Sequence, residues 1–309
     1  SYLWEHILTR EHWLDILGRF IHLERKEEED EFGKKQVKET LIFPRYHQWE
    51  AVALLEETTR VEGPGQRYLI QHSAGSGKSN SIAWIAHRLA SLHDAENTKL
   101  FDSVIVITDR TVLDKQLQET IYQFEHKEGV VVRISDREVK SQQLVHALVE
   151  RSPIIIVTIQ TFPFILEAIQ GQTSLKARTF AVIADEAHRS QYGFGGKVNE
   201  RTGEMSYGFA SNLRDALPNA SFIGFTGTPI EKTDANTRAV FGNYISIYDI
   251  QRAVADKATV PIYYESRLAK LKLSEAEKPK VDPKFEEVTE GEEIDRKEQL
   301  KSKWAQLEA

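Results

Sequence analysis

The sequence predicts an α/β fold in which a mostly parallel β-sheet is covered by helices on both faces. From about residue 41 to residue 268, short runs rich in β-branched residues alternate with longer segments of helical periodicity. These short runs are apolar throughout, which is typical of strands that are buried on both faces of a parallel sheet. Ligands of such sheets bind at the carboxyl ends of the strands, so we expect functional residues directly after the runs.

The individual elements follow from the same alternation. The predicted strands are Tyr68–Gln71, Val104–Thr108, Val130–Ile134, Ile154–Thr158, Phe180–Ala184 and Phe222–Thr226. The predicted helices cover residues 44–59, 78–93, 112–125, 141–151, 162–169 and 207–217.

Both ends of the chain differ from this middle region. Residues 1–40 carry apolar residues at helical spacing and then a charge run at Glu24–Glu31, which predicts one or two amphipathic helices followed by a solvated segment. Residues 269–309 are rich in Glu and Lys, and we expect a linker that leads into a helix. Because the only methionine is Met205, we expect either a removed initiator or a piece of a longer protein.

Composition excludes several classes of protein. With 40% hydrophobic and 28% charged residues, the 309-residue chain is neither disordered throughout nor collagenous. It has no cysteine, so disulfides and thiolate metal sites are excluded and the cytoplasm is the expected compartment. No apolar run reaches the roughly 18 residues of a membrane span. The net charge of −7 is concentrated in Glu24–Glu31 and beyond Ser274, so the nearly neutral middle does not exclude a nucleic-acid partner.

A glycine-rich loop follows the first predicted strand and precedes a predicted helix. This context is the one that a phosphate-binding loop requires. Gly75, Ser76 and Gly77 would turn backbone N–H groups around a phosphate, Lys78 would reach the β- and γ-phosphates of ATP, and the Ser79 hydroxyl would bind Mg²⁺. His72 stands where the full pattern has its first glycine. A chance glycine turn is the alternative interpretation.

Two adjacent carboxylates end the strand Phe180–Ala184. Asp185 would hold Mg²⁺, and Glu186 would act as the general base that polarises the attacking water. On its own, such a pair is more typical of an acidic surface turn. The phosphate loop at a compatible position in the sheet favours the catalytic interpretation.

Small hydroxyl residues end the next strand, in Thr226-Gly227-Thr228-Pro229. The hydroxyl groups of Thr226 and Thr228 could bind the acidic motif and sense the state of the nucleotide. An ordinary Gly-Thr-Pro turn is the alternative.

These three motifs, in this order, resemble motifs I, II and III of superfamily 2 helicases and translocases. The strings DEAHRSQYG, FTGTPI and ITDRTVLDKQ, with His72 and Arg45-Tyr46-His47-Gln48, resemble more specifically the restriction (R) subunit of type I restriction–modification enzymes. The resemblance implies a RecA-like P-loop NTPase lobe over residues 41–268 that uses ATP and Mg²⁺ to translocate duplex DNA before cleavage. It also implies the modification and specificity subunits as partners.

The resemblance assigns further roles. Gln48 is similar to the glutamine that reads adenine, with a solvated helix residue as the alternative. The motif with His188 is expected to relay between nucleotide and DNA. The DNA phosphates would be contacted after two strands, by Thr108 and Arg110 and by Thr158, Gln160 and Thr161. Hydrogen bonding within the strand ends is an equal alternative for each of these five residues.

Two features of the family are missing from this chain. The nuclease pattern of Asp followed by Glu-x-Lys has a decoy in Asp15 with Glu24 and Lys26, which helical periodicity places at a solvated helix end. Arginines of a second motor lobe, which complete the ATP site in this superfamily, are also missing, so we expect weak ATP binding and poor hydrolysis. Two alternatives stay open: another superfamily 2 helicase or remodeller lobe, and a nucleotide-binding regulatory module without turnover.

Overall fold

The computed structural model describes most of the first 261 residues. The described ranges are 2–29, 35–108, 111–124, 129–134, 140–158, 175, 177–187, 197–198, 205–206, 217–227, 237–238 and 241–261. The chain divides into two compact units, residues 1–260 and 261–309. Of the second unit only Pro261 is described, so the linker expected over residues 269–309 lies outside the described residues.

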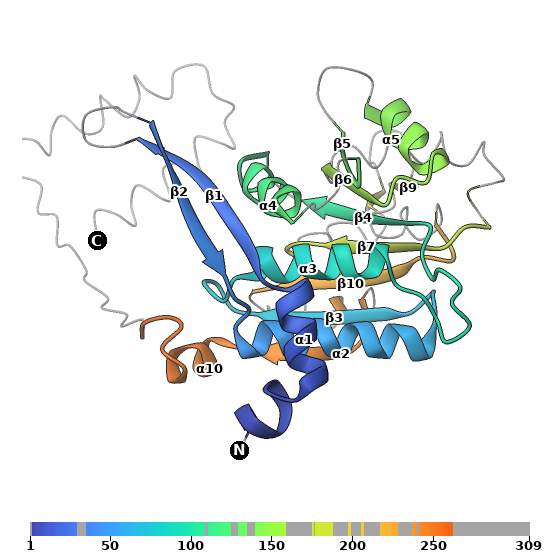
Figure 1. Cartoon of the computed structure of the whole chain (residues 1–309). Coiled ribbons are helices and arrows are strands. Elements are labelled where there is room, and N and C mark those ends of the chain that lie inside the picture. The colour runs from blue at the N-terminus through green and yellow to red at the C-terminus, as the bar shows by residue number, and fades with distance from the viewer. Residues whose placement is uncertain are drawn as a thin grey trace, which may run out of the picture. The chain divides into compact units, whose positions relative to one another are not determined.

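A seven-stranded parallel sheet forms the centre of the first unit (Figure 1). Its strands are β3 (Arg67–His72), β4 (Ser103–Thr108), β5 (Val131–Arg133), β6 (Ile154–Thr158), β7 (Phe180–Ala184), β10 (Ser221–Thr226) and β11 (Tyr244–Tyr248), in the order β11-β3-β10-β7-β4-β6-β5. Neighbouring strands in this sheet run parallel to one another. The predicted α/β class and its six strands are therefore confirmed, and β11 is an additional strand at one edge.

The sheet order brings the three sequence motifs together. Strand β10 lies between β3 and β7, with Thr226 paired to Gln71 and Gly224 paired to Ala184. Because the strands are parallel, the phosphate loop, the acidic pair and the Thr226–Gly227 turn all leave the sheet at the same edge.

Helices cover both faces of the sheet and enclose two separate apolar cores. One core joins α1 (Arg10–Arg19), α2 (Tyr46–Glu62), α3 (Lys78–Ala90) and α4 (Thr111–Gln123) to the sheet, and the other includes α5 (Lys140–Val149). Alternate residues of each strand enter opposite cores: Val104 and Val106 face the first, and Ile105 and Ile107 the second. Four predicted helices are thus confirmed, whereas those expected at 162–169 and 207–217 lie, apart from Leu217, outside the described residues.

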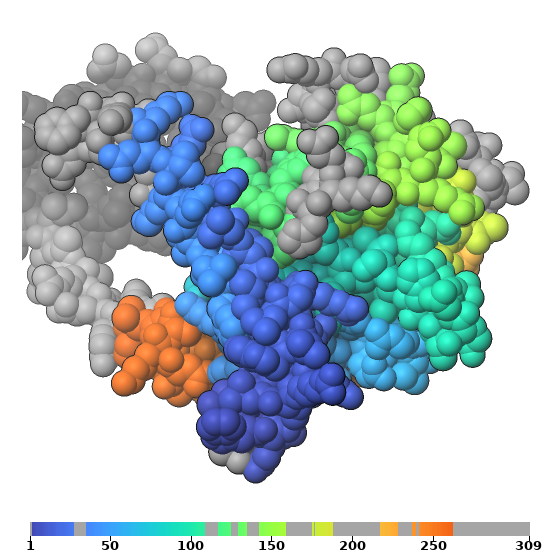
Figure 2. Space-filling view, viewed as in Figure 1, coloured from blue at the N-terminus to red at the C-terminus, as the bar shows by residue number. Residues whose placement is uncertain are grey.

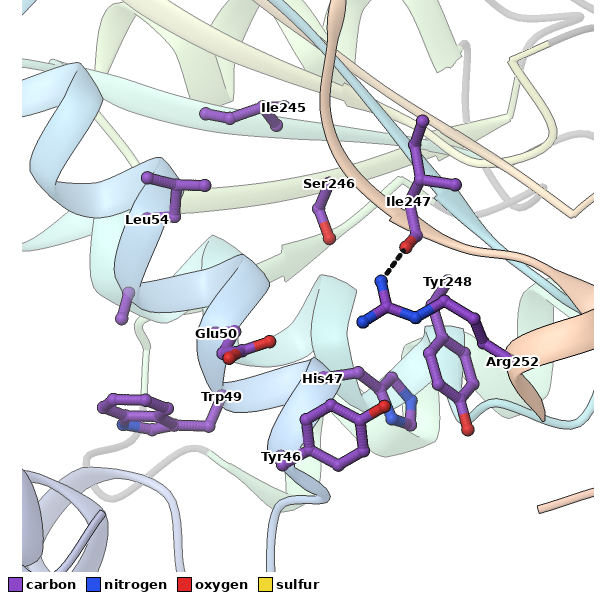
Figure 3. Close-up of a pocket in the computed structure, with 11 residues that line it drawn as sticks. Tyr46, His47, Trp49, Glu50, Leu54, Ile245, Ser246, Ile247, Tyr248 and Arg252 are labelled. Carbon is purple, nitrogen blue, oxygen red and sulfur yellow. Dashed lines mark hydrogen bonds between the residues drawn. The ribbon is translucent and has the colours of Figure 1, made fainter. Parts of the chain in front are cut away.

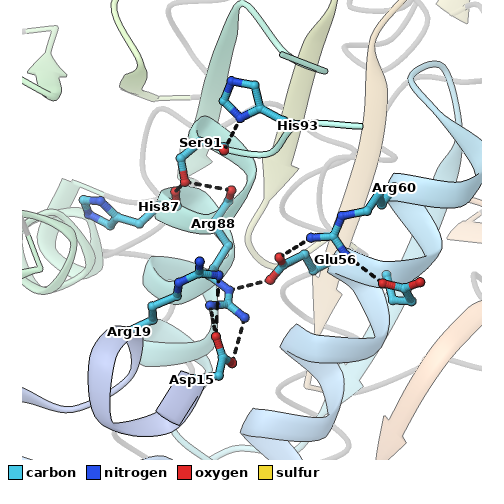
Figure 4. Close-up of polar contacts among 9 residues, drawn as sticks. Asp15, Arg19, Glu56, Arg60, His87, Arg88, Ser91 and His93 are labelled. Carbon is cyan, nitrogen blue, oxygen red and sulfur yellow. Dashed lines mark hydrogen bonds and ion pairs between the residues drawn. The ribbon is translucent and has the colours of Figure 1, made fainter. Parts of the chain in front are cut away.

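The N-terminal helices are joined to α3 by polar contacts. A short π-helix, η1 (Leu3–Ile7), precedes α1, whose N-terminus is capped by Thr9. The Trp84 indole of α3 donates a hydrogen bond to the carbonyl of Phe20 at 3.0 Å. Arg88 of the same helix binds Asp15 of α1 through both guanidinium Nη atoms, at 2.6 and 2.9 Å (Figure 4).

The charge run after α1 is not the solvated helix end that the sequence predicts. It forms an antiparallel hairpin of β1 (His22–Glu29) and β2 (Lys35–Ile42), and Figure 2 shows the hairpin at the molecular surface. Arg25 lies directly opposite Glu39, and the two side chains form an ion pair at 2.9 Å. Charged and polar side chains take the place of the apolar alternation that normally marks a strand, so the segment is largely exposed as predicted but forms a hairpin and not a helix end. Of the apparent nuclease pattern, Asp15 pairs with Arg88, and Lys26 pairs with Glu24 at 2.9 Å.

Three further elements were absent from the prediction. Strands β8 (Lys197–Val198) and β9 (Met205–Ser206) form a short antiparallel pair, and α10 (Ile250–Ala255) follows β11. Among the described helices, none combines the length and the apolar character needed to cross a membrane.

Candidate functional site

The phosphate loop joins β3 to α3 and has the backbone geometry that an anion site needs. Gly75 and Gly77 have φ values of +77° and +82°, in the left-handed region that favours glycine. The Ser76 amide donates to the Ser73 carbonyl at 3.2 Å and closes the turn. Helix α3 then begins at Lys78, so its N-terminal amides and positive dipole end lie at the loop.

Gly77 is required for a second reason, because it lies against the side chain of Gln48. A Cβ atom at Gly77 would overlap the Gln48 amide nitrogen. That amide donates to the Gly77 carbonyl at 2.9 Å, while its oxygen accepts from the Arg45 backbone at 2.8 Å. Gln48 is 3% exposed, so the side chain expected to read adenine is held between α2 and the loop.

The acidic pair leaves β7 in a strained turn. The Asp185 amide donates to the Ile107 carbonyl at 3.1 Å and the Asp185 carboxylate accepts from the Glu186 amide at 2.9 Å. Glu186 has a φ of +49°, which a residue with a side chain rarely adopts and which the surrounding structure must therefore enforce. The Ala187 amide donates to the Phe225 carbonyl at 2.7 Å and ties the turn to β10.

An ion pair connects the phosphate loop to the acidic motif. The Lys78 ammonium lies 2.8 Å from the Glu186 carboxylate, and the two side chains are 16% and 27% exposed. Gly227 approaches the same lysine, because a Cβ atom at Gly227 would lie 3.0 Å from Nζ of Lys78. The loop, the acidic pair and the third motif thus meet at one ammonium group.

Two neutral imidazoles lie beside the loop. His72 is completely buried, and burial, together with the charge of Lys78 and the neighbouring His47, lowers the pKa of His72 to about 3. Burial also lowers the pKa of His47, although its hydrogen bond with the Ser76 carbonyl opposes this shift. Both rings are therefore uncharged at neutral pH.

The sequence pattern of the SWI2/SNF2 ATPases matches residues 47–298, which is more than half of the chain. The chain belongs to the SWI2/SNF2 ATPase family. It is 39% identical over 267 residues to the type I restriction enzyme HindI endonuclease subunit of Haemophilus influenzae, covering 84% of this chain and 24% of that protein. It is 30% identical over 313 residues to the putative type I restriction enzyme MjaIXP endonuclease subunit of Methanocaldococcus jannaschii, covering 98% of this chain and 26% of that protein.

A solved structure with a similar description is the fragment of a putative HsdR subunit of a type I restriction enzyme from Vibrio vulnificus. It is 16% identical, with a TM-score of 0.42, and the match covers 83% of this chain and 46% of that one. This SWI2/SNF2 ATPase chain spans about a quarter of the length of the curated relatives it matches.

The phosphate loop of this SWI2/SNF2 ATPase and the residues beside it carry hydrogen-bonding groups and oxygen ligands that fit a triphosphate and Mg²⁺. The hydroxyls of Ser73 and Ser76 are buried and have no hydrogen-bond partner in the described part of the chain. Ser79, on the first turn of α3, and Asp185 are both half-buried and supply a hydroxyl and a carboxylate. Such oxygen ligands suit Mg²⁺, which takes its remaining ligands from phosphate and water. Within the described ranges no group of three or more His, Cys, Asp or Glu side chains is placed to hold a metal ion.

Two of the candidate DNA-contacting residues lie along the same edge of the SWI2/SNF2 ATPase sheet. Thr108 ends β4 and Thr158 ends β6, and the two residues are paired across these neighbouring strands. Thr108 is buried and Thr158 half-buried. Thr226 is buried at the end of β10. The other expected residues, Arg110, Gln160, Thr161, His188 and Thr228, lie outside the described residues.

No sequence motif assigns a functional role to His47 or Tyr248, yet both contact the phosphate loop. Tyr248 ends β11, and its carbonyl accepts a hydrogen bond from the Ser73 amide at 2.9 Å. In the sequence, His47 appears only as one member of the string Arg45-Tyr46-His47-Gln48, without a role of its own. Because the contact between His47 and the loop spans 29 positions of the chain, no local pattern signals it.

Proposed function

We propose that this chain is the ATP-binding motor lobe of a type I restriction enzyme R subunit and that its ATP hydrolysis drives translocation of duplex DNA. The observation that carries the ATPase assignment is the meeting of Lys78 with Glu186 across β3 and β7, beside a loop with two left-handed glycines. The match to SWI2/SNF2 ATPases and the similarity to type I restriction endonuclease subunits support the wider assignment.

Each residue of the site has a role that its position supports. The amides of the phosphate loop and the Lys78 ammonium would bind the β- and γ-phosphates. Ser79 and Asp185 would hold Mg²⁺, which neutralises charge that develops on the phosphate oxygens. Glu186 would take a proton from the attacking water as its oxygen bonds to the γ-phosphorus and the bond to ADP breaks.

The ion pair of Lys78 with Glu186 links binding to catalysis. A γ-phosphate that recruits the ammonium group competes directly with the Glu186 carboxylate, because both anions use the same donor. Once the lysine changes partner, Glu186 is available to accept a proton from water. Glu186 therefore weakens the binding of nucleotide slightly in the ground state and serves hydrolysis afterwards.

Two substitutions test this assignment through binding and turnover. Lys78→Ala is expected to weaken ATP binding by about 100-fold or more, since a charge-assisted contact to phosphate is lost. Glu186→Gln is expected to bind ATP as tightly as the wild type or more tightly, while turnover falls by about 100-fold or more with the general base. Titration with a fluorescent ATP analogue and phosphate release, each with and without duplex DNA, measure the two effects.

A matched control is Lys99→Ala, which removes an exposed lysine from the turn after α3. It should leave both quantities unchanged. Wild-type affinity in Lys78→Ala would contradict the assignment of the loop. If Glu186→Gln left turnover intact, the general base would lie elsewhere, and tight binding without turnover in the wild type would favour a regulatory nucleotide-binding module.

The partners belong to the same proposal. DNA phosphates would be contacted at the strand ends that carry Thr108 and Thr158, with Arg110, Gln160 and Thr161 following them in sequence. The modification and specificity subunits would anchor the complex on DNA, as the similarity to type I endonuclease subunits suggests. A chain without cysteine needs no oxidising compartment, and we place the enzyme in the cytoplasm, where it would meet its duplex DNA substrate.

A further inference from the structure

The first turn of α2 faces the carbonyl side of the phosphate loop. Three consecutive loop carbonyls, those of Gly75, Ser76 and Gly77, lie within hydrogen-bonding distance of side chains from this turn. The donors are Nη1 of Arg45 at 3.4 Å, Nε2 of His47 at 3.0 Å and Nε2 of Gln48 at 2.9 Å, respectively. The two shorter contacts come from residues that are only 4% and 3% exposed.

His47 is held rigidly in this position. Its ring stacks face to face on Tyr248, with centroids 3.7 Å apart and planes 6° from parallel (Figure 3). Because a carbonyl accepts, Nε2 of the neutral ring must carry the proton and donate to Ser76. The Tyr248 carbonyl in turn accepts from the Ser73 amide, so α2 and β11 hold opposite ends of the same turn.

The orientation of a peptide unit makes these contacts relevant to phosphate. In a trans peptide the C=O of one residue points away from the N–H of the next. His47 holds the Ser76 carbonyl. The Gly77 carbonyl is held by Gln48 together with the Asn80 and Ser81 amides of α3 at 3.1 and 3.3 Å. The amides of Gly77 and Lys78 therefore point away from these donors. These are the amides that a phosphate bound at the N-terminus of α3 would use.

We propose that His47, together with Gln48, acts as a positioning residue that presets the phosphate loop from its carbonyl side. This inference rests on the proposed ATPase function and changes the expected role of Gln48. A glutamine that reads adenine would influence the choice of base. A glutamine that holds the Gly77 carbonyl influences phosphate binding, whichever base is attached.

Substitutions at His47 separate its donor from its stacking. His47→Phe keeps a ring against Tyr248 but cannot donate to Ser76. His47→Gln places an amide nitrogen at a similar distance from Cα and restores the donor without the ring. His93→Phe is the matched control, because the His93 ring also contacts a carbonyl, that of Ser91 at 2.8 Å, in an exposed turn remote from the loop.

The binding experiment uses the 309-residue chain with three probes in the presence of Mg²⁺: ATP, GTP and inorganic tripolyphosphate. We expect His47→Phe to weaken all three by the same factor, about 5- to 30-fold, the loss typical of one buried hydrogen bond. His47→Gln should recover most of the affinity, and His93→Phe should match the wild type. Gln48→Ala should also weaken all three probes together.

Hydrogen exchange of the nucleotide-free protein gives an independent test. The Ser73 and Ser76 amides, which donate to the carbonyls of Tyr248 and Ser73, should exchange faster in His47→Phe than in the wild type, with circular dichroism and thermal melting confirming that both are folded. Wild-type affinity and wild-type exchange in His47→Phe would overturn the proposal. Loss of ATP binding without loss of tripolyphosphate binding in Gln48→Ala would return Gln48 to adenine recognition.

The two layers of the proposal can fail separately. If the wild type bound none of the three probes, the ATPase assignment would fail. Faster exchange in His47→Phe would still support the positioning role. If the wild type bound all three and His47→Phe neither weakened binding nor accelerated exchange, only the positioning role would be wrong.

Discussion

At the scale of single residues, His72 shows how the environment fixes a charge state. Its ring is completely buried, 5.3 Å from the ring of His47, and lies near the rings of Phe225 and Tyr248. Its Nε2 is 3.5 Å from the Ser246 hydroxyl. Burial is the main reason that this imidazole stays neutral, and the Lys78 ammonium adds repulsion against a proton.

The lowered pKa of His72 predicts sensitivity of the fold to acid. The unfolded chain takes up a proton at this residue near pH 6.5, but the folded state resists protonation until about pH 3. His72 therefore has no effect on the pH dependence of the free energy of unfolding above about pH 7. As the pH drops from about 6.5 to about 3, His72 lowers the free energy of unfolding by up to about 1.4 kcal/mol per pH unit. His72→Gln should flatten the dependence of the free energy of unfolding on pH.

Urea denaturation at pH 7.5 and pH 5.5 measures this difference. The readout is the change in stability between the two pH values, so a general destabilisation by the substitution does not affect it. The remaining slope of the variant should come from His47, whose pKa is also lowered and which faces Arg45, Glu50 and Asp256. Parallel pH profiles for wild type and variant would contradict the assigned cause.

At the scale of elements, a network of charges joins three helices. Arg88 of α3 binds Asp15 of α1 and Glu56 of α2, the latter at 2.5 Å, and Glu56 also binds Arg60 at 2.7 Å (Figure 4). Arg88 and Glu56 are each about 10% exposed, and the guanidinium lies 5.1 Å from the centre of the Phe20 ring. The helix that begins at the phosphate loop thus fixes the N-terminal helix at its other end.

Removing the shared cation should be far more costly than removing a peripheral one. Arg88→Met removes the cation that Asp15 and Glu56 share, leaving these carboxylates the contacts with Arg19 at 3.6 Å and with Arg60 at 2.7 Å. It is expected to destabilise the fold by about 3 kcal/mol. Arg60→Ala affects a side chain that is 36% exposed and should cost about 1 kcal/mol or less. Chemical denaturation measures both free energies.

A double-mutant cycle between Asp15→Ala and Arg88→Met isolates the contact between α1 and α3. We expect a coupling energy of about 1–3 kcal/mol, typical of residues in one charged network. Independent effects at the two sites would show that α1 is held by its apolar contacts alone.

Elements whose burial shows in their own residues could be predicted from the sequence, whereas elements that depend on a distant partner segment could not. Strands β4, β7 and β10 are buried along their whole length, so their apolar runs are visible in the sequence. Strands β1 and β2 pair through charges such as Arg25 with Glu39, and this depends on the partner strand rather than on a local period. Likewise, the motif residues at the strand ends could be located, but the contact of His47 with Ser76 arises only when α2 packs on the loop.

At the scale of the whole molecule, the described site contains groups from one lobe only. Lys78, Glu186 and the loop all belong to the same sheet, and the chain spans about a quarter of the length of its curated relatives. The resemblance to superfamily 2 motors implies that arginines of a second lobe complete the ATP site. We therefore expect full activity to need a second lobe in addition to the residues described.

This division predicts a large difference in turnover between a long relative and its matching segment. The complete HindI endonuclease subunit should hydrolyse ATP in the presence of duplex DNA on the order of 10³-fold faster than the segment that aligns with this chain. Phosphate release at saturating ATP measures both rates. Comparable rates would show that one lobe is sufficient for hydrolysis.

The strand order β3-β10-β7 also has a consequence for folding. Lys78 and Glu186 are separated by 108 positions of the chain, and β10, which follows both, must insert between their strands. Such non-local pairing is slow because chain entropy is lost before the contacts form. The site is therefore completed only when the central sheet is complete. A ligand that binds only the completed site stabilises the fully folded sheet. A ligand at 100 times its Kd would add about 2.7 kcal/mol to the stability of the finished sheet.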